Sequence, residues 1–577
     1  MGFFSRRRPA GSSGTEGSGP TPPKDGEHAR QAPDPLAVVR AYHVGTHHDF
    51  QRYAAGPLDL DWKTQPDPFR RFAGAELVPL ERVEPGPEPR FEPAYHHGAV
   101  PARAFDRSSI SQLFYDSFAI SAWKQYGEAR WALRCNPSSG NLHPTEAYLI
   151  APPLDGWRST GFVAHYASDV HALEVRAELP EELVRELTRG FTGPVAFVGL
   201  TSIAWREAWK YGERAFRYCQ LDLGHALGAL AVAAAGLGWR ARRIDALSSD
   251  EVAALCGVDA QRGPEREEPE TWVALQPADA PEPELALGAD SNEWVRRARA
   301  LAWRGRPNDL SSAHVDWDAL EAIAIATRKP RTLASTTPSR LELREARDRE
   351  PDALGLRQVV RRRRSATGFD PTRGLAREGF LQTLSRTLAG RGRLVTEVVP
   401  GAPRIDLVCF VHRVAGLDSG IYLLLRDPAR RESWRHALGV EGELETVDTA
   451  PFDLALVRLR AGDVRATARS LACHQEIASD GCFSVAAFAD LESELGAHGP
   501  RVYRELHWEA GFVVHLLYLE AEALGLSGTG IGCYFDQPTR GSVGLGARGP
   551  VCLYQFACGA RVDDPRLTTL AGYGSED

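Results

Sequence analysis

The sequence predicts an α+β fold built from two similar halves, each with a sheet packed against helices. A long amphipathic helix occurs twice, and each copy ends in a Leu-Gly stop that is followed by a glycine-containing segment and a predicted strand. Strongly apolar strands are predicted in both halves, at Glu146–Pro152 and at Ile405–Val414. Strands that alternate with helices favour layers of sheet and helix around a shared core.

The repeat is the strongest of these observations. Gly212–Gly238 aligns without a gap to Gly499–Gly525, at an offset of 287 residues. The identical pairs include Arg214 and Arg501, Arg217 and Arg504, Gly224 and Gly511, Leu230 and Leu517, Ala234 and Ala521, and Gly238 and Gly525. Any two long amphipathic helices look alike, but a glycine inside a helix costs about 1 kcal/mol relative to alanine. We therefore interpret the shared interior glycine and arginine pair as a tandem duplication.

Composition bounds the remaining possibilities. The 577 residues, 43% hydrophobic and 25% charged, predict a multidomain globular protein. We expect a disordered tail over 1–35, an N-terminal extension over 36–100, a first domain over 101–300, a linker over 301–354 and a second domain over 355–577. The net charge of −8 gives no reason to expect nucleic acid, and no apolar run of 18 residues or export signal is present, so we expect a cytoplasmic protein.

The nine cysteines include no CxxC motif. Several lie inside apolar runs, so we expect buried free thiols and no metal site.

Three segments carry candidate binding chemistry. The turn in Arg134–Ile150 (RCNPSSGNLHPTEAYLI) offers backbone N–H groups and hydroxyls to a polar ring or a phosphate, although it also fits a plain surface turn. The arginines in Val359–Asp370 (VVRRRRSATGFD) suit a phosphate clamp, a solvated basic face or a nucleic-acid patch. Three glycines in Gly528–Asp536 (GTGIGCYFD) let the backbone approach a flat ligand, or form an ordinary turn.

Together these segments resemble a known family. The run PSSGNLHPTEAYLI, the RRS-x-x-x-F pattern from Arg363 to Phe369 and the helix followed by GTGIG are similar to the FMN-dependent nitroreductase superfamily. The resemblance is closer to its SagB/ThcOx-type dehydrogenase branch, which oxidises azolines to azoles in ribosomal peptide biosynthesis. It covers most of 100–245 and 355–570, and implies two fused nitroreductase-like domains that form an intrachain pseudo-dimer.

The resemblance also implies a cofactor and its contacts. Members are homodimers that bind FMN at the two-fold interface with residues from both subunits. If the family contacts are carried over to this sequence, the phosphate and ribityl end of FMN would contact Arg363, Arg364 and Ser365, with Arg566 near the phosphate. The isoalloxazine ring would be bordered by Pro137, Ser138, Ser139 and Asn141, and Gly530 and Ile531 would lie near it.

This chain departs from the family pattern in both halves. In place of the PSSGN turn (Pro137–Asn141), the second half has Pro400–Val411 (PGAPRIDLVCFV). In place of the RRS clamp (Arg363–Ser365), the first half has Arg107–Phe114 (RSSISQLF). The two surviving half-sites are complementary, so we expect one good FMN site and one degenerate site. Thr367 replaces a basic residue that is often found two positions after the serine, which would weaken phosphate binding.

A lysine-tyrosine pair is the candidate catalytic group. In azoline dehydrogenases such a pair serves proton removal, and Lys210 and Tyr211 are similar, whereas the repeat partner has Ala497 and His498. A base there needs a pKa lowered by burial or by cations such as Arg206 and Arg214. In the alternative interpretation, Lys210 pairs with Glu207 or Glu213 on a helix surface and Tyr211 only packs.

Two functions therefore remain. The first is an FMN-dependent oxidoreductase that transfers hydride by a ping-pong scheme, acting on a peptide heterocycle or on a small electrophile such as a quinone or nitro compound. The second is a catalytically decayed flavin-binding or scaffold partner in a biosynthetic complex. We expect no membrane or nucleic-acid partner, and the sequence leaves open whether the fused pair dimerises further.

Overall fold

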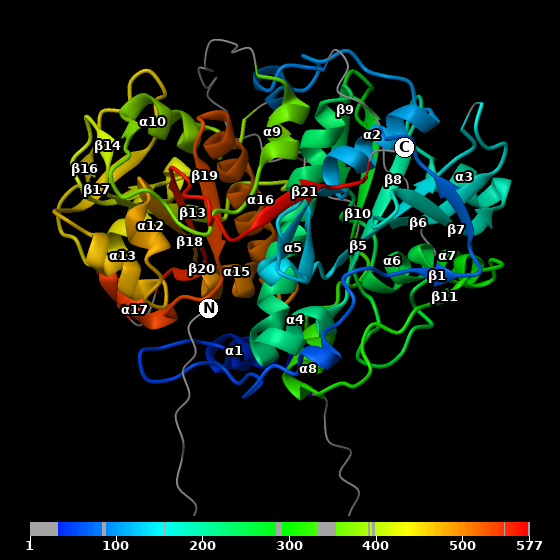
Figure 1. Ribbon diagram of the computed structural model, residues 1–577, viewed down its shortest axis with the longest axis horizontal. Helices are drawn as coiled ribbons and strands as arrows, with labels where there is room; N and C mark the ends of the chain where they lie inside the picture. Colours follow the sequence, from blue (N-terminus) through cyan, green and yellow to red (C-terminus); the bar gives the residue numbers. More distant parts are fainter. Residues whose placement is uncertain are drawn as a thin grey trace, which may run out of the picture.

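The computed structural model describes residues 33–82, 88–154, 156–283, 291–332, 354–390, 393–394, 398–546 and 549–574. Nearly all of the tail expected over 1–35, and 333–353 of the expected linker, lie outside the described residues. Figure 1 shows two lobes side by side, the first half in cyan and green and the second in yellow to red, with two long helices between them.

The first half contains a seven-stranded antiparallel sheet. In spatial order its strands are β2 (Glu76–Pro79), β7 (Ala172–Leu179), β6 (Gly161–Ala167), β5 (Thr145–Ala151), β8 (Ala196–Ser202), β10 (Glu268–Pro277) and β9 (Trp239–Arg243). The edge strand β2 comes from the N-terminal extension. The helices that belong to this half are α2 (Arg107–Ser117), α3 (Glu181–Leu187), α4 (Ala204–Tyr211), α5 (Ala215–Ala235), α6 (Ser249–Cys256) and α7 (Ser291–Arg299).

The second half contains a seven-stranded antiparallel sheet with the corresponding order. Its strands are β16 (Glu445–Thr446), β17 (Leu456–Ala461), β15 (Gly420–Leu424), β13 (Ile405–Val411), β18 (Phe483–Ala489), β20 (Val551–Gly559) and β19 (Ser527–Ile531). Its helices are α9 (Leu356–Arg362), α10 (Arg377–Ser385), α12 (Arg431–Ala437), α13 (Arg465–Leu471), α14 (Ile477–Asp480), α15 (Leu491–His498), α16 (Val502–Ala523) and α17 (Asp536–Ser542). The predicted α+β fold of two similar halves is confirmed.

The smaller elements join the halves. The last strand β21 (Thr568–Ala571) pairs with β3 (Ile120–Tyr126), which pairs in turn with β4 (Ala129–Arg134), so the C-terminal segment crosses back to the first half. At the other end, α1 (Pro35–Gly45) packs near α8 (Asp318–Ala326), which lies within the expected linker. Short strand pairs are formed by β1 (Phe72–Ala73) with β11 (Arg306–Pro307) and by β12 (Leu375–Ala376) with β14 (Val414–Ala415).

The repeated helices α5 and α16 pack against each other in the middle of the molecule (Figure 1). Their matched glycines lie at the contact: a Cβ added at Gly224 would be 2.8 Å from Cα of Gly511 and closer still to the Trp508 carbonyl oxygen. A Cβ added at Gly511 would press on the Leu221 carbonyl in the same way. The interior glycines therefore serve the close approach of two backbones.

The matched arginines form reciprocal ion pairs between the halves. Arg214 and Arg217 of the first half bind Asp536 of the second, at 3.0 and 2.7 Å. Arg504 of the second half binds Glu270 of the first at 2.6 Å, and Arg501 donates to the backbone carbonyl of the same glutamate at 2.9 Å. These charges are buried, so each needs its partner.

Within the described residues, no helix is both long enough and apolar enough to cross a lipid bilayer.

The close approach of the helices makes a testable prediction. Gly224→Ala should lower the free energy of unfolding by about 1–3 kcal/mol, because the added methyl group overpacks a backbone contact. Gly496→Ala is the matched control within helix α15, where an added Cβ meets no atom within 4 Å. It should raise stability by up to about 1 kcal/mol through helix propensity. Chemical denaturation of both variants measures the difference, and equal effects would contradict the packing argument.

Candidate functional site

A cavity of about 260 Å³ lies where the two halves meet. The first half contributes Pro137, Ser138, Ser139, Gly140, Asn141, Tyr211, Tyr218 and His225, and the second contributes Ser365, Gln475, Tyr518, Thr529, Gly530, Ile531, Gly532, Cys533 and Tyr554. The structure thus brings together the PSSGN turn of one half and the glycine-rich strand and Ser365 of the other. Two half-sites that lie far apart in the sequence form one composite cavity.

Hydrogen bonds to Asp222 of helix α5 hold the PSSGN turn in place. The backbone N–H and the hydroxyl of Ser139 donate to Asp222, at 3.0 and 2.9 Å, and the backbone N–H of His143 donates to the Ser138 hydroxyl at 2.8 Å. Burial raises the pKa of Asp222 to about 7, although the hydrogen bonds from Ser138 and Ser139 favour its ionised form. Asp222 is therefore an anchor whose charge changes near neutral pH.

The second half uses the same anchor without the same turn. Glu509, the repeat partner of Asp222, accepts the backbone N–H of Arg404 at 3.1 Å and that of Ile405 at 3.3 Å. The acid on the central helix thus fixes the segment before the central strand in both halves, and only the first half places a serine-rich turn there.

Lys210 and Tyr211 lie at the end of α4, against the PSSGN turn. A Cβ added at Gly140 would be 2.7 Å from the Tyr211 hydroxyl and 3.0 Å from Lys210 Nζ, and Gly140 itself has φ of +60°. The Tyr211 ring lines the cavity and packs on Tyr218, with ring centroids 4.5 Å apart. Only glycine at position 140 leaves room for both polar groups next to the turn.

The surface pairing considered for Lys210 does not occur. Among the described residues, Lys210 forms no ion pair within 4.0 Å with Glu207 or Glu213, and Glu207 is fully buried. Burial, more than offsetting the attraction of Glu207, lowers the pKa of Lys210. Burial and the nearby Asp222 raise the pKa of Glu207 well above its usual range.

The cations expected to lower the pKa of Lys210 are engaged elsewhere. Arg206 is buried and paired with Glu146, and Arg214 is paired with Asp536. Burial, rather than a neighbouring cation, is the cause of the lowered lysine pKa.

The arginine motif binds the second half to the first. Arg363 is buried and donates to the carbonyls of Arg134 at 3.0 Å and Cys135 at 3.2 Å. Its Nη1 has no hydrogen-bond partner among the described residues. Arg364 donates to the Ser121 carbonyl at 2.9 Å. Burial and the charge of Arg363 lower the pKa of Arg364 to about 10, which leaves it cationic at neutral pH.

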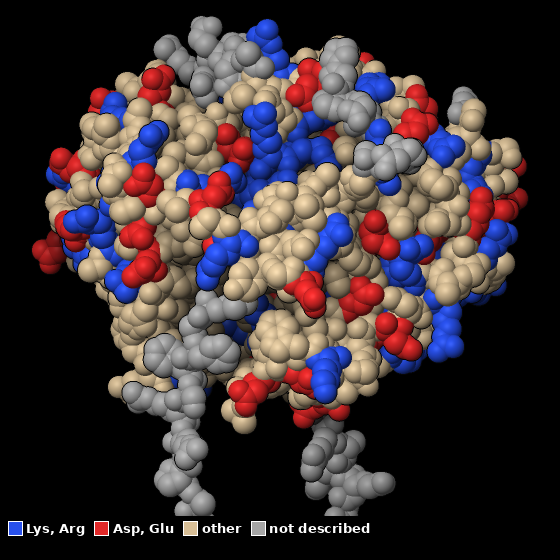
Figure 2. All heavy atoms as spheres, viewed as in Figure 1, with Lys and Arg blue, Asp and Glu red and all other residues tan. Residues whose placement is uncertain are grey.

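A wider basic cluster surrounds this motif. Figure 2 shows Lys and Arg atoms gathered in a hollow near α9 and β21. Charges that influence one another here belong to Lys124, Arg361, Arg362, Arg364 and Arg561, together with the buried Arg363. Glu522 faces the cluster, but burial raises its pKa against the opposing pull of Arg363 and Arg561. Asp563 pairs with Arg561 at 2.9 Å and acts, with Asp564, on Lys124, so the six cations are neutralised only in part. An excess of cations suits a phosphate.

The structure separates Arg566 from the other predicted residues. Its side chain pairs with Asp564 at 2.7 Å, is 70% exposed and does not line the cavity. The reason is local: the two residues are neighbours in a turn on the outer surface before β21.

The sequence argument missed several groups that line the cavity. One of them is Tyr518, whose hydroxyl lies 3.0 Å from the hydroxyl of the predicted Ser365 and accepts the Gly530 N–H at 2.6 Å. The Tyr554 hydroxyl lies 3.0 Å from His225 Nε2, and burial lowers the pKa of His225 to about 3. A signal was present for part of this set, because Tyr218 and His225 lie seven residues apart on α5 and so share one side of that helix, whereas Tyr211 ends α4.

The strand of the first half that corresponds to the glycine-rich strand β19 is rich in arginine. Strand β9 matches β19 in sheet order, and the repeat offset of 287 places Arg243 at the position of Gly530, with Arg240 and Arg242 at those of Ser527 and Thr529. Arg243 packs over the Trp508 ring, 5.4 Å from its centroid, and pairs with Asp245 at 2.7 Å. No open glycine surface exists on this strand.

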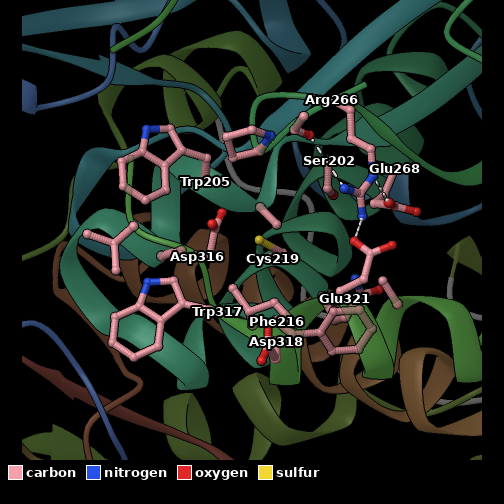
Figure 3. Close-up of a pocket in the computed structure, with 18 of the residues that line it drawn as sticks. Ser202, Trp205, Phe216, Cys219, Arg266, Glu268, Asp316, Trp317, Asp318 and Glu321 are labelled. Atoms are coloured by element: carbon pink, nitrogen blue, oxygen red, sulfur yellow. Dashed lines mark hydrogen bonds and ion pairs between the residues drawn. The ribbon is translucent and has the colours of Figure 1, made fainter. Parts of the chain in front are cut away.

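A second cavity, of about 320 Å³, lies apart from these motifs. Figure 3 shows Trp205 and Trp317 on one side and Arg266, paired with Glu268 and Glu321, on the other. All of its lining residues fall within 202–324, and none belongs to the three sequence motifs. We therefore place the candidate site in the composite cavity.

Asp222 makes a prediction about pH. Its pKa is higher in the folded chain than the unfolded value of 3.8, so between 3.8 and about 7 the folded state binds more protons than the unfolded state. Stability from this group should fall as pH rises through that window, by up to about 1.4 kcal/mol per pH unit. Asp222→Asn keeps the acceptor and removes the titration, so its unfolding free energy should depend less on pH than that of the wild type. Parallel curves for the two proteins from pH 4.5 to 7.5 would contradict this.

Comparisons with known proteins support the fold. No family model matches the chain, and no curated protein matches its sequence. The solved structure of a "putative nitroreductase" from Anabaena variabilis matches 91% of this chain and 99% of its own, with 19% identity and a TM-score of 0.65. The Escherichia coli microcin synthetase McbBCD complex with truncated pro-MccB17 matches 43% of this chain and 94% of its own, at 18% identity and a TM-score of only 0.26. Over 91% of its length, the chain therefore shares the fold of that putative nitroreductase.

Proposed function

We propose that this chain is an FMN-dependent oxidoreductase with one flavin site at the junction of its halves. One observation carries the proposal: the PSSGN turn, Ser365 and the Gly530 strand meet around a single cavity, although they come from different halves. A homodimer with this arrangement would have two equivalent sites, whereas here the repeat places Arg243, packed over the Trp508 ring, at the position of Gly530.

The residues present fit a flavin mononucleotide. Buried polar atoms without partners among the described residues include Arg363 Nη1 and His225 Nδ1, and such atoms call for a polar ligand. Backbone of Gly530 and Gly532 forms part of the cavity wall, with Tyr554 and Tyr218 packed against these glycines, and the basic cluster suits a phosphate. The cavity of about 260 Å³ is near the lower limit for small-molecule sites, so it suits the ring better than the whole nucleotide.

The chain's own groups would handle the proton. When bound, FMN supplies a two-electron centre that accepts or donates hydride at N5. Lys210 Nζ and the Tyr211 hydroxyl lie beside Gly140, on the side of the cavity formed by the PSSGN turn. The lowered pKa of Lys210 makes its neutral form, a base, easier to reach, and the raised pKa of Tyr211, caused first by burial, keeps its hydroxyl protonated. Lysine would take the proton and tyrosine would hold the reacting group in place.

The substrate is a peptide heterocycle of the azoline type or a small electrophile. The Lys-Tyr pair supports dehydrogenation, because that reaction requires removal of a proton from carbon together with hydride transfer. The second candidate function, a catalytically decayed flavin-binding partner, is consistent with the composite cavity but does not explain the position of Lys210 beside it.

Flavin titration tests the proposal. We expect one tightly bound FMN per chain, and the purified protein should absorb at roughly 450 nm, as bound flavins do. Arg364→Ala should weaken FMN binding about tenfold or more, because it removes a cation from the phosphate end. Arg566→Ala is the matched control and should leave the affinity unchanged, because its side chain pairs with Asp564 on the surface. Two FMN per chain, or equal losses in both variants, would count against the site.

Lys210 distinguishes the enzyme from the decayed partner. Lys210→Ala should retain FMN but lose turnover by about 10²-fold or more, the usual contribution of a general base. Lys63→Ala, at an exposed position in the N-terminal extension, serves as the control. Single-turnover reduction of the bound flavin by substrate is the measurement, and an unchanged rate in Lys210→Ala would leave the scaffold function as the better account.

A further inference from the structure

Two of the nine cysteines differ from the rest in exposure. Seven are buried, as the sequence predicts, whereas Cys473 and Cys533 are partly exposed. Their sulfur atoms lie 2.7 Å apart, although the residues are separated by 60 positions in the sequence. A disulfide bond has a sulfur–sulfur length of about 2.05 Å. A small side-chain movement would therefore bring the two sulfur atoms to the distance of a disulfide bond.

The pair lies where three segments meet. Cys473 follows helix α13, Cys533 follows strand β19, and His48 of the N-terminal extension lies beside Cys533. The hydrogen bond shared with Cys473 lowers the pKa of Cys533, and the neighbouring His48 acts in the same direction, while burial opposes both. Cys533 would therefore be the nucleophile, because the thiolate is the reactive form of cysteine.

The surroundings restrict what can reach the sulfurs. The rings of Phe50, His474 and Phe535 pack on one another next to the pair, with centroids 4.7 to 6.3 Å apart. Phe50 and Tyr53 are themselves more than half exposed, so this aromatic group lies at the surface. A small disulfide compound can approach there, and a folded protein would have to displace the rings.

We propose that Cys473 and Cys533 form a thiol–disulfide exchange site for low-molecular-weight disulfides, distinct from the Lys210 chemistry. The Cys533 thiolate attacks one sulfur of the compound R–S–S–R, forms a mixed disulfide and releases one thiolate, RS⁻. Cys473, once deprotonated, attacks the Cys533 sulfur of the mixed disulfide and releases the second RS⁻. Two protein thiols are oxidised to one disulfide, and the small disulfide is reduced to two thiols.

Closure of the disulfide would also act on the candidate flavin cavity. Cys533 and Gln475 both line that cavity, and Gln475 Nε2 donates to the Cys533 carbonyl at 3.1 Å. A bond between Cys473 and Cys533 would fasten two segments of its wall together. The exchange chemistry itself needs no flavin, so it stands whether or not the proposed function holds.

The test uses oxidised glutathione and the full-length chain, both flavin-free and after incubation with FMN. The reduced protein is mixed with the disulfide, quenched with acid, alkylated and digested, and the peptides are identified by mass spectrometry. We expect a peptide pair linked through Cys473 and Cys533, with the other seven thiols still alkylated under denaturing conditions. Absence of that linked pair, with both cysteines recovered as free thiols, would overturn the proposal.

Variants assign the order of the steps. Cys473→Ser should stop the reaction at a glutathione adduct on Cys533, and Cys533→Ser should react at least tenfold more slowly at Cys473. Cys482→Ser is the matched control, because Cys482 is buried and contacts the Arg373 carbonyl, and it should behave as the wild type. Equal reactivity of Cys473 and Cys533 in the two single variants, at pH 6 and at pH 8, would contradict the assigned nucleophile. Loss of FMN binding alone would leave these results unchanged.

Discussion

The approach of α5 to α16 at Gly224 and Gly511 fixes the distance between the two halves. Each glycine faces backbone of the other helix, so the contact tolerates no side chain. The arginines on the same helices then reach acids in the opposite half, Asp536 and Glu270, and neutralise charges that neither half could bury alone. Close backbone contact and reciprocal ion pairs together give the junction one register, and the composite cavity lies next to it.

The junction is symmetric in architecture and asymmetric in chemistry. The two sheets correspond in order except at the edge strands β2 and β16, and the acid of the central helix, Asp222 or Glu509, anchors the segment before the central strand in each half. A binding site also needs an empty surface, and here the halves differ. Strand β19 presents glycines, whereas β9 presents arginines that pack on Trp508 and pair with nearby acids.

The candidate site has two electrostatic ends. Near the PSSGN turn, burial raises the pKa values of Glu207 and Asp222 and lowers that of Lys210, so proton transfer among these groups becomes easier near neutral pH. At the other end, arginines around Arg364 carry more positive charge than the nearby acids neutralise. The PSSGN turn and the arginine cluster therefore differ in their electrostatic environment.

The sequence by itself determined the local features and the pairing of the halves. Helix periodicity, apolar strands and the repeat predict α5, α16, β5 and β13 correctly, because these depend on short-range patterns. It also indicated that the PSSGN turn and the Gly530 strand are complementary half-sites. Only the tertiary structure decided which side chains line the cavity: it adds His225 and Tyr554, whereas Arg363, Arg364 and Arg566 are not among the lining residues. It likewise brings together Cys473 and Cys533. Such contacts arise from the packing of one half on the other and from the N-terminal extension, and side-chain direction across an interface leaves no periodic trace in a single sequence.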